Sequence, residues 1–294
     1  MKRRVQKMRI WQVGLDIQES GFYAFAVQHQ RYGWQLRHWF YQPVIAPLFS
    51  HADTTNSYQF IEALKKWHRQ LPKGVSIRVA LPAGAILQQS VSLPAQKLSP
   101  QEQGWFVEAS VVKLFPLSAR ELTVDYRAIS SVSPESESTK NMVITAARRT
   151  DIERWTTLLA QAGIFPDIID TVPCVLRAMA SMAAINSDYL LVHQLEHQYL
   201  VVSPLNQAFA YRLLPNDGQS CPDRMACALQ TFRQLSGQHI DNIYFSGLGD
   251  TSELPANVQC WSPMVALHQM QPPLPDEPHQ FVLACGLALR REDA

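Results

Sequence analysis

Stretches rich in apolar, β-branched and aromatic residues, separated by turn-like residues, fill the first 45 positions of the chain, and this pattern predicts three β-strands. Turn-like residues separate the strands, which are expected at 10–16, 21–28 and 34–42. A different period follows, because Tyr58, Ile61 and Leu64 recur at helical spacing. The pattern therefore predicts a helix over residues 57–70 after a three-stranded antiparallel start.

The clearest helix signal in the chain begins at residue 99. Ser99 can cap a helix, Pro100 suits the first helical position, and Glu102 can complete a capping box. We expect this helix to reach residue 115 and to end at Pro116, since proline cannot continue the hydrogen-bonding pattern.

The rest of the first half alternates between strand and helix signals. Strands are expected at 75–81, 86–93, 122–129, 142–147 and 164–170, a Ser- and Glu-rich loop at 130–141, and helices ending near 163 and spanning 173–185. The first of these two helices has a second capping pair, Thr150 and Glu153, at its start.

The second half repeats this order of elements without repeating the sequence. Strands are expected at 189–194, 198–203, 207–214 and 240–245, and helices at 223–236 and 280–290. Three antiparallel strands followed by helix–strand alternation thus occur twice. The duplication predicts an α/β fold with two related halves facing a cleft.

Composition places the chain among globular proteins and removes one function class. Hydrophobic residues make up 47% of the 294 residues and charged residues 17%, which is enough to build a sizeable core. The formal net charge of +1 argues against a nucleic-acid binder that relies on overall basicity.

Cysteine usage and hydropathy both indicate a cytoplasmic protein. The five cysteines form no C-x-x-C pair, so we expect buried, reduced thiols rather than disulfides or a zinc ribbon. No apolar run approaches the ~20 residues that cross a bilayer. The basic start MKRRVQKMRI leads into a poor signal-peptide core, interrupted by Gln12 and Gly14.

Several stretches, in this order and spacing, resemble a known family. They are VGLDIQES, VALPAGAILQQSVSLP, VVKLFPLSARELTVDYRAI, KNMVITAARRTDIERWTTLLAQAGIFPDIID, ALQTFRQLSGQHIDNIYFSGLGD and FVLACGLALR. Together they span nearly the whole chain. The sequence is similar to the pilus-assembly protein PilM and to its relative HofM of DNA uptake, and more distantly to the cell-division protein FtsA.

The resemblance implies an actin-like (ribonuclease H-like) duplicated α/β fold with a small inserted subdomain and a reduced second half. The first subdomain would comprise 1–75, completed by 146–185 and 280–294, the insert 76–145, and the shortened second subdomain 186–279. A member of this family would sit on the cytoplasmic face of the inner membrane as a peripheral scaffold of a type IV pilus or competence machine.

The same resemblance implies a partner, namely the short N-terminal cytoplasmic tail of a single-pass membrane protein like PilN or HofN. The tail would bind in a groove beside the insert, and the resemblance also implies self-association, as in actin relatives. The residues expected to line that groove are Pro82, Ala83, Gly84, Trp105, Glu108, Phe115 and Pro116. Glu108 would pair with a basic residue of the tail.

Family members can hold ATP with a magnesium ion, so the corresponding positions are the candidate cofactor site. They are Asp16, Ser20, His193, Gly247 and Gly249. An Asp organises the metal, and glycines let backbone N–H groups approach phosphate oxygens.

This chain departs from the pattern at both phosphate turns. The first reads Asp16-Ile17-Gln18-Glu19-Ser20, with a bulky and an acidic side chain where glycine is expected, and the second begins with His193. The segment that would build one wall of the adenine site is also short. We expect a non-enzymatic protein with lost or very weak nucleotide binding; an active ATPase of the same fold is the alternative.

A zinc hydrolase is a third hypothesis, because His193-Gln194-Leu195-Glu196-His197 matches the inverted zinc-protease signature H-x-x-E-H. That chemistry needs both histidines on one helical face. The flanking YLLV and QYLVV favour strands, so we expect a hairpin tip and no metal site. Separately, the N-terminal run Lys2, Arg3, Arg4, Lys7 and Arg9 is a candidate contact with anionic lipid, against the simpler reading of a solvated terminus.

Overall fold

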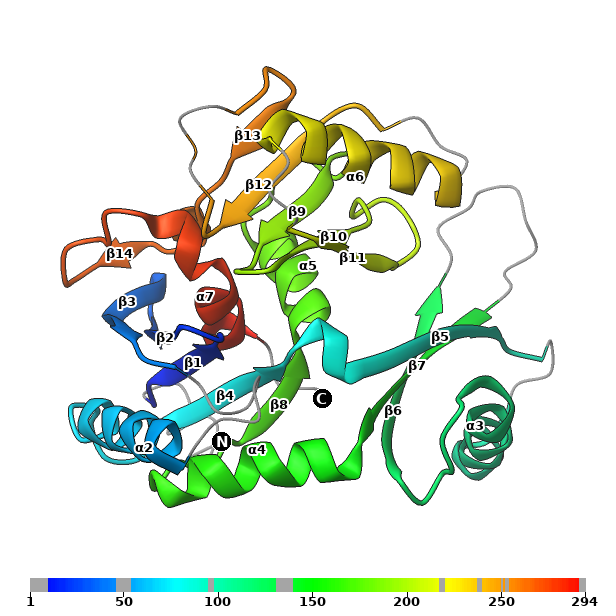
Figure 1. Ribbon diagram of the computed structural model, residues 1–294, viewed down its shortest axis with the longest axis horizontal. Helices are drawn as coiled ribbons and strands as arrows, with labels where there is room; N and C mark the ends of the chain where they lie inside the picture. The colour runs from blue at the N-terminus through cyan, green and yellow to red at the C-terminus, as the bar shows by residue number, and fades with distance from the viewer. Residues whose placement is uncertain are drawn as a thin grey trace. The chain divides into compact units, whose positions relative to one another are not determined.

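A computed structural model of the chain describes residues 10–45, 54–94, 98–130, 140–216, 220–236, 240–249, 251 and 254–290. The chain divides into two compact units, unit 1 formed by Met1–Ala80 with Leu158–Ala294 and unit 2 by Leu81–Thr157 (Figure 1).

Unit 1 begins with a six-stranded sheet in the order β14-β3-β2-β1-β4-β8. Its strands are β1 (Gln12–Ile17), β2 (Gly21–Gln30), β3 (Gly33–Pro43), β4 (Ser76–Leu81), β8 (Ile168–Thr171) and β14 (Gln269–Met270). The first three strands pair antiparallel in sequence order, and β4 joins β1 in parallel. The sequence predicted this antiparallel start. Most residues of β2 are buried, among them Phe22, Ala24 and Val27.

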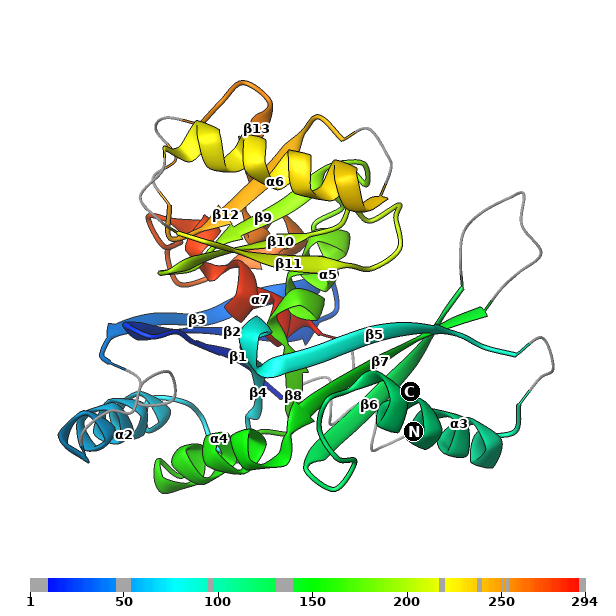
Figure 2. The same cartoon turned by 45° about the vertical axis from the view of Figure 1, so that its right-hand side comes forward.

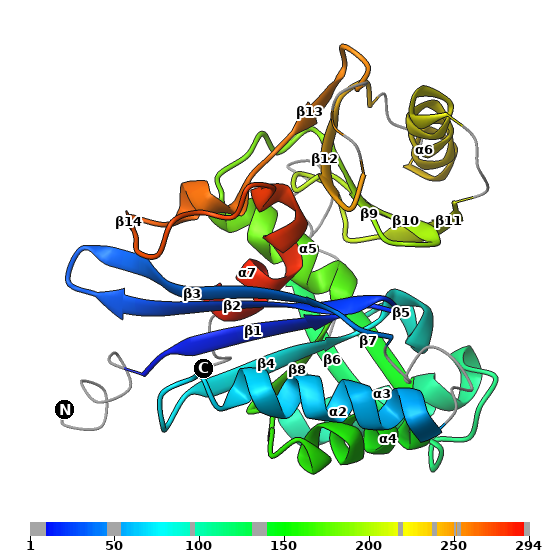
Figure 3. The same ribbon diagram turned by 60° about the vertical axis from the view of Figure 1, so that its left-hand side comes forward.

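Helices cover both faces of this sheet (Figure 3). On one face Phe22 of β2 makes edge contacts with Phe60 and Trp67 of α2 (Thr54–His68). On the other face α7 (Val282–Leu289), buried on all sides, packs against β1 and β2. Helix and strand approach so closely there that a Cβ on Gly14 would lie 1.9 Å from the carbonyl oxygen of Ala284.

A buried arginine fixes the end of α7. Arg78 on β4 is fully buried, and its Nη1 donates to the carbonyl oxygens of Ala288 at 3.1 Å and of Arg290. The last carbonyl groups of a helix have no partner within the helix, so a cation that bonds them also offsets the negative end of the helix dipole. Arg78 therefore connects the first sheet to the C-terminus of α7.

The second sheet of unit 1 has five strands in the order β11-β10-β9-β12-β13. They are β9 (Leu190–Gln194), β10 (Gln198–Val202), β11 (Tyr211–Pro215), β12 (Ile243–Gly247) and β13 (Val258–Cys260). One face carries α6 (Cys221–Ser236), whose Met225, Leu229 and Phe232 enter the core of this half. The other face carries α5 (Val172–Met182), which also packs against α7 (Figure 1).

The two sheets share one topology. In each, three consecutive antiparallel strands stand beside a parallel fourth strand, β4 next to β1 and β12 next to β9. The expected duplication of an α/β half is thus present. The turns β1–β2 and β9–β10 occupy the same place in the two halves.

Unit 2 is a three-stranded sheet covered by one helix (Figure 2). The strands β5 (Ile86–Ser92), β6 (Leu122–Ser130) and β7 (Lys140–Arg148) pair antiparallel with β7 in the centre. Helix α3 (Pro100–Leu114) starts at the predicted capping box, since Ser99 and Glu102 bond each other's backbone N–H groups. Val107, Val111 and Phe115 join Met142 and Ile144 of β7 in the core of this unit.

The structure differs from the sequence-based expectations in four places. The stretch 164–170 is largely irregular, and its strand is β8, Ile168–Thr171. The short strands β13 and β14 were not predicted, because three and two residues show no period. Helix α4 (Arg149–Gln161) starts directly after β7, so Thr150 lies inside it rather than at its cap. Where an insert at 76–145 was expected, Ser76–Leu81 forms β4 beside β1, and the compact unit is Leu81–Thr157.

Candidate functional site

Two tight turns of unit 1 bring the candidate cofactor residues together. The β1–β2 turn is closed by a hydrogen bond from the Gln18 N–H to the Gly21 carbonyl at 2.9 Å. The β9–β10 turn is closed by the bond from the Leu195 N–H to the Gln198 carbonyl at 2.8 Å. These turns hold Glu19 and Ser20 on one side and Glu196 and His197 on the other, although about 176 residues separate them.

Asp16 lies at the base of the first turn. Its carboxylate is buried, and the Gln18 side-chain amide donates to its Oδ2 at 2.8 Å. Burial raises the pKa of Asp16 to about 6, the Gln18 hydrogen bond opposes this, and the nearby Glu196 adds to it. The metal-organising aspartate expected from the sequence thus has an amide of its own chain as hydrogen-bond partner.

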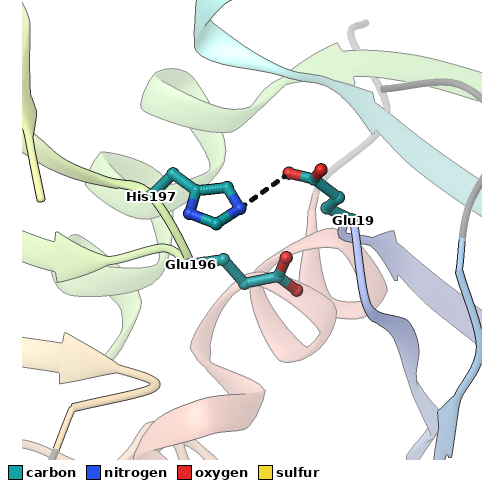
Figure 4. A group of neighbouring side chains, drawn as sticks. All are labelled: Glu19, Glu196 and His197. Carbon is teal, nitrogen blue, oxygen red and sulfur yellow. Dashed lines mark ion pairs between the residues drawn. The ribbon is translucent and has the colours of Figure 1, made fainter. Parts of the chain in front are cut away.

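Contacts between side chains and backbone join the two turns directly. The Ser20 backbone N–H donates to Glu196 Oε1 at 2.8 Å, and the Ser20 hydroxyl donates to the same oxygen. His197 Nε2 lies 3.3 Å from Glu19 Oε2 (Figure 4). The Glu196 carboxylate therefore occupies the donors that a phosphate oxygen would need at this turn.

His193, the candidate residue at the second phosphate turn, is enclosed in the sheet. It pairs across β9–β12 with Ser246, and its Nδ1 lies 2.8 Å from the Ser246 hydroxyl oxygen. Burial, and to a smaller extent the neighbouring His279, lowers the pKa of His193 to about 3. His193 is neutral at physiological pH and faces the protein interior.

The space beside the candidate glycines Gly247 and Gly249 is also filled by the protein. Gly247 has a φ of +102°, and a Cβ there would lie 2.2 Å from the Gln194 carbonyl oxygen. A Cβ on Gly249 would lie 2.2 Å from the Gln194 side-chain oxygen. Gly247 is required by the close approach of the Gln194 backbone, so its presence does not by itself indicate a phosphate-binding loop.

The H-x-x-E-H pentapeptide runs from the end of β9 through a turn to the start of β10, as the expected hairpin tip. His193 is buried and His197 is exposed, so these two histidines do not converge on one ligand. The zinc-hydrolase reading of this motif is wrong, because a strand places them on a buried position and a turn.

All of the residues expected to bind a partner lie in unit 2. Pro82, Ala83 and Gly84 lie between β4 and β5, and the other four lie on α3 or directly after it. Gly84, Trp105, Glu108 and Pro116 are exposed. Two expectations need correction: Ala83 and Phe115 are buried, at 4% and 7% exposed, and Phe115 belongs to the core under α3. Neither is available for direct contact.

Helix α3 also exposes an apolar residue that the sequence analysis missed. Trp105 is 60% exposed and Val112 is 70% exposed. They lie about two turns apart on one face of α3, opposite the buried Val107 and Val111. Counting helical positions from the buried residues would have found Val112.

Sequence reasoning also missed how the cleft is closed. It assigned Glu196 to the zinc motif and Gln194 to no role, whereas Glu196 binds Ser20 and Gln194 fills the space beside Gly247. One sequence holds no signal for such long-range pairs. The basic residues at 2–9 lie outside the described residues, and no described helix has the length and hydropathy to cross a membrane.

Two α/β halves that share one strand topology, with their first turns in direct contact, define the actin-like class of proteins. This confirms the fold class expected from the sequence. Comparison with solved structures agrees. The structure described as the PilM–PilN type IV pilus biogenesis complex aligns with a TM-score of 0.71 at 18% identity, covering 96% of this chain and 98% of the other.

The chain belongs to the type IV pilus assembly protein PilM family, whose model matches residues 14–196. The DNA utilization protein HofM of Escherichia coli (strain K12) is 23% identical over 281 residues, which span 96% of this chain and 97% of HofM. The cytoplasmic domain of EpsL, an inner membrane component of the type II secretion system of Vibrio cholerae, aligns with a TM-score of 0.54 at 12% identity, covering 86% and 91% of the two chains.

Proposed function

We propose that this chain is a cytoplasmic scaffold of a type IV pilus or DNA-uptake machine that binds the short N-terminal tail of a PilN-like membrane protein. Family membership supports the pilus or uptake setting. A partner of the PilN type is supported by the similar structure, which is of a PilM–PilN complex. A tail bound this way would hold the chain at the inner membrane.

The outer face of α3 is the observation that carries this proposal to particular residues. Trp105 and Val112 leave most of their apolar surface in water, while the opposite side of the same helix packs into the core of unit 2. Aromatic residues that can bury a large area are typical anchors of binding surfaces. Trp105 is the strongest candidate anchor for an apolar residue of the tail.

Charge on the same helix suits a basic tail. Glu108 is exposed and lies between Trp105 and Val112 along α3. An exposed ion pair contributes at most about 1 kcal/mol, so Glu108 would favour orientation more than affinity. Because a flexible tail loses entropy on binding, we expect affinities on the order of micromolar rather than nanomolar.

A scaffold role also fits the closed turns of unit 1. The Ser20 N–H and hydroxyl donate to Glu196, the Asp16 carboxylate accepts from Gln18, and Gln194 fills the space at Gly249. A phosphate group would have to displace all of these contacts. We infer that recognition of the tail, and not ATP hydrolysis, is the main activity of the chain.

The test uses a synthetic peptide with the N-terminal cytoplasmic residues of the PilN-like protein from the same genome. Isothermal titration calorimetry should show saturable binding to the whole chain, and Trp105→Ala should weaken it at least about tenfold, a loss of about 1.4 kcal/mol. Tyr58→Ala is the matched control, since Tyr58 is 67% exposed on α2 of unit 1.

Equal binding by the wild type and Trp105→Ala would exclude α3 as the surface while leaving the partner in place. Lack of binding at high micromolar concentrations of the peptide would contradict the proposed function itself. Salt separates the two contributions: Glu108→Gln should lower the salt dependence of binding, because the charge pair is screened and the apolar anchor is not.

A further inference from the structure

Three metal-ligating side chains meet where the two turns of unit 1 touch. Glu19, Glu196 and His197 each offer one donor atom, and these atoms all lie within 4.8 Å of one another (Figure 4). Ligands bound to a tetrahedral zinc ion at ~2.1 Å lie about 3.4 Å apart. Small side-chain rotations therefore suffice to bring the three donors onto one ion.

The turns that carry these ligands are held in place. Asn216 donates from its backbone N–H to the His197 carbonyl at 2.7 Å and from its side chain to the Glu196 carbonyl at 3.2 Å. Ser20 donates twice to Glu196 Oε1, which leaves the second carboxylate oxygen for another partner. Hydrogen bonds of this kind orient ligating carboxylates in metal sites.

The cluster is short of positive charge. Among the described residues, neither Glu19 nor Glu196 has a lysine or arginine within ion-pair distance, and His197 is the only basic partner. Two neighbouring carboxylates that belong to different halves of the fold repel each other unless a cation lies between them.

A buried oxygen in the same turn gives independent support. Gln18 directly precedes Glu19, is 6% exposed, and its Oε1 has no hydrogen-bond partner within the described part of the chain. Nε2 of the same amide is used by Asp16. A buried carbonyl oxygen without a donor is costly. Water bound to a metal ion is a donor of the type that this oxygen lacks.

We propose that Glu19, Glu196 and His197 form a binding site for a divalent transition-metal ion that bridges the two halves of unit 1. Two carboxylates and one imidazole favour Zn²⁺ over Mg²⁺ or Ca²⁺, which prefer oxygen ligands alone. Three protein ligands leave a position for water. The site is distinct from the H-x-x-E-H reading, because the buried His193 takes no part.

The consequence of binding would be a stabilised cleft. The ligands come from turns on the two sheets, so an ion that holds all three opposes separation of the halves. A ligand that binds the folded state alone raises its stability with concentration by mass action. The ion would thus provide the connection between halves that a bound nucleotide provides in an actin-like ATPase.

The experiment uses the whole chain with Cys227→Ser and Cys260→Ser, because these exposed thiols could bind zinc themselves. Calorimetric titration with ZnCl₂ should show one saturable site and a rise in the unfolding temperature, neither of them reproduced by excess MgCl₂. Glu19→Gln and His197→Gln should each weaken binding at least about tenfold. Co²⁺ in place of Zn²⁺ should give an absorption band that these variants lose.

Matched controls are Glu153→Gln and His68→Gln, which remove the same chemical groups from elsewhere on the chain. Both should bind zinc like the parent protein. His197 is 76% exposed at its side chain, so its substitution should leave the metal-free unfolding temperature unchanged. Absence of saturable zinc binding, or equal affinity in the His197→Gln variant and the parent, would overturn the proposal.

Discussion

The closed turns of unit 1 and the outer face of α3 in unit 2 treat their functional side chains in opposite ways. At the turns, polar groups expected to bind a ligand use each other as partners: Ser20 binds Glu196, and Gln18 binds Asp16. On α3, Trp105 and Val112 expose apolar surface without a role in the core. Within one chain, the polar groups of the two turns use each other as partners, and the apolar surface of α3 is left exposed.

This difference shows which sequence features are informative about ligand binding in an actin-like protein. Glycine and aspartate at expected positions are compatible with a closed site, since Gly247 is required by the backbone of Gln194. Exposed apolar residues on an otherwise well-packed helix have no structural need. Under the proposed function, α3 is therefore the recognition surface.

The largest effect is expected where the cleft is most tightly filled. Gly247→Ala would put a Cβ within 2.2 Å of the Gln194 carbonyl oxygen at a φ of +102°. Backbone strain and overpacking should together lower the free energy of unfolding by about 4 kcal/mol. Chemical denaturation followed by circular dichroism measures this loss.

Gly104→Ala on α3 is the matched control for that substitution. A Cβ on Gly104 meets nothing within 4 Å, and the residue lies inside a helix. Alanine should raise the free energy of unfolding by up to about 1 kcal/mol. Similar destabilisation by the two substitutions would show that the contacts of Gln194 do not restrict Gly247.

The next effect compares two neighbouring valines on α3. Val111 is 2% exposed and Val112 is 70% exposed. Val111→Ala should lower the free energy of unfolding by about 2–3 kcal/mol, because it leaves a cavity in the core of unit 2. Val112→Ala should change it by less than about 0.5 kcal/mol. Thermal unfolding of both variants decides whether Val112 is free for a partner.

The buried carboxylate of the cleft gives the third effect, and it depends on pH. The pKa of Asp16 is raised to about 6, so the folded protein holds this proton more tightly than the unfolded chain. Stability from this group is present at low pH and is lost as pH rises through 6. Asp16→Asn should therefore stabilise the protein by about 2 kcal/mol above pH 7 and by nothing below pH 4.

His193 makes the same variant more sensitive to acid. The pKa of His193 is lowered to about 3, so the unfolded chain binds this proton more tightly and stability falls as pH drops below about 6.5. In the wild type this loss is offset by Asp16. Urea denaturation at a series of pH values should show a steeper acid loss in Asp16→Asn, and parallel curves would contradict the raised pKa of Asp16.

Much of the fold could be predicted from the sequence, because local signals agree with it. The capping box at Ser99 and Glu102 starts α3 where expected. The apolar stretches between turn residues predicted the three antiparallel strands β1 to β3. Elements without a period could not be predicted, such as β13. The duplicated topology was predicted from the order of elements. The family was predicted from a resemblance, and the family model that matches residues 14–196 confirms it.

The candidate site could be predicted only in part, because its contacts join distant residues. Asp16 and Ser20 were found from the pattern around β1, but their closure by Gln18 and Glu196 depends on side-chain geometry. Phe115 was expected at the surface and lies in the core, since it continues the four-residue spacing of the buried Val107 and Val111. Arg78 gave no sequence signal for its role at the end of α7.

Titration of the wild-type chain with the PilN-type tail peptide, with and without ATP and Mg²⁺, tests the central claim most directly. Calorimetry should show micromolar binding of the peptide in the absence of nucleotide, with a dissociation constant that ATP and Mg²⁺ leave unchanged. Peptide binding that requires ATP, or tight magnesium-dependent binding of ATP itself, would contradict the conclusion that the filled cleft has left recognition to the surface of α3.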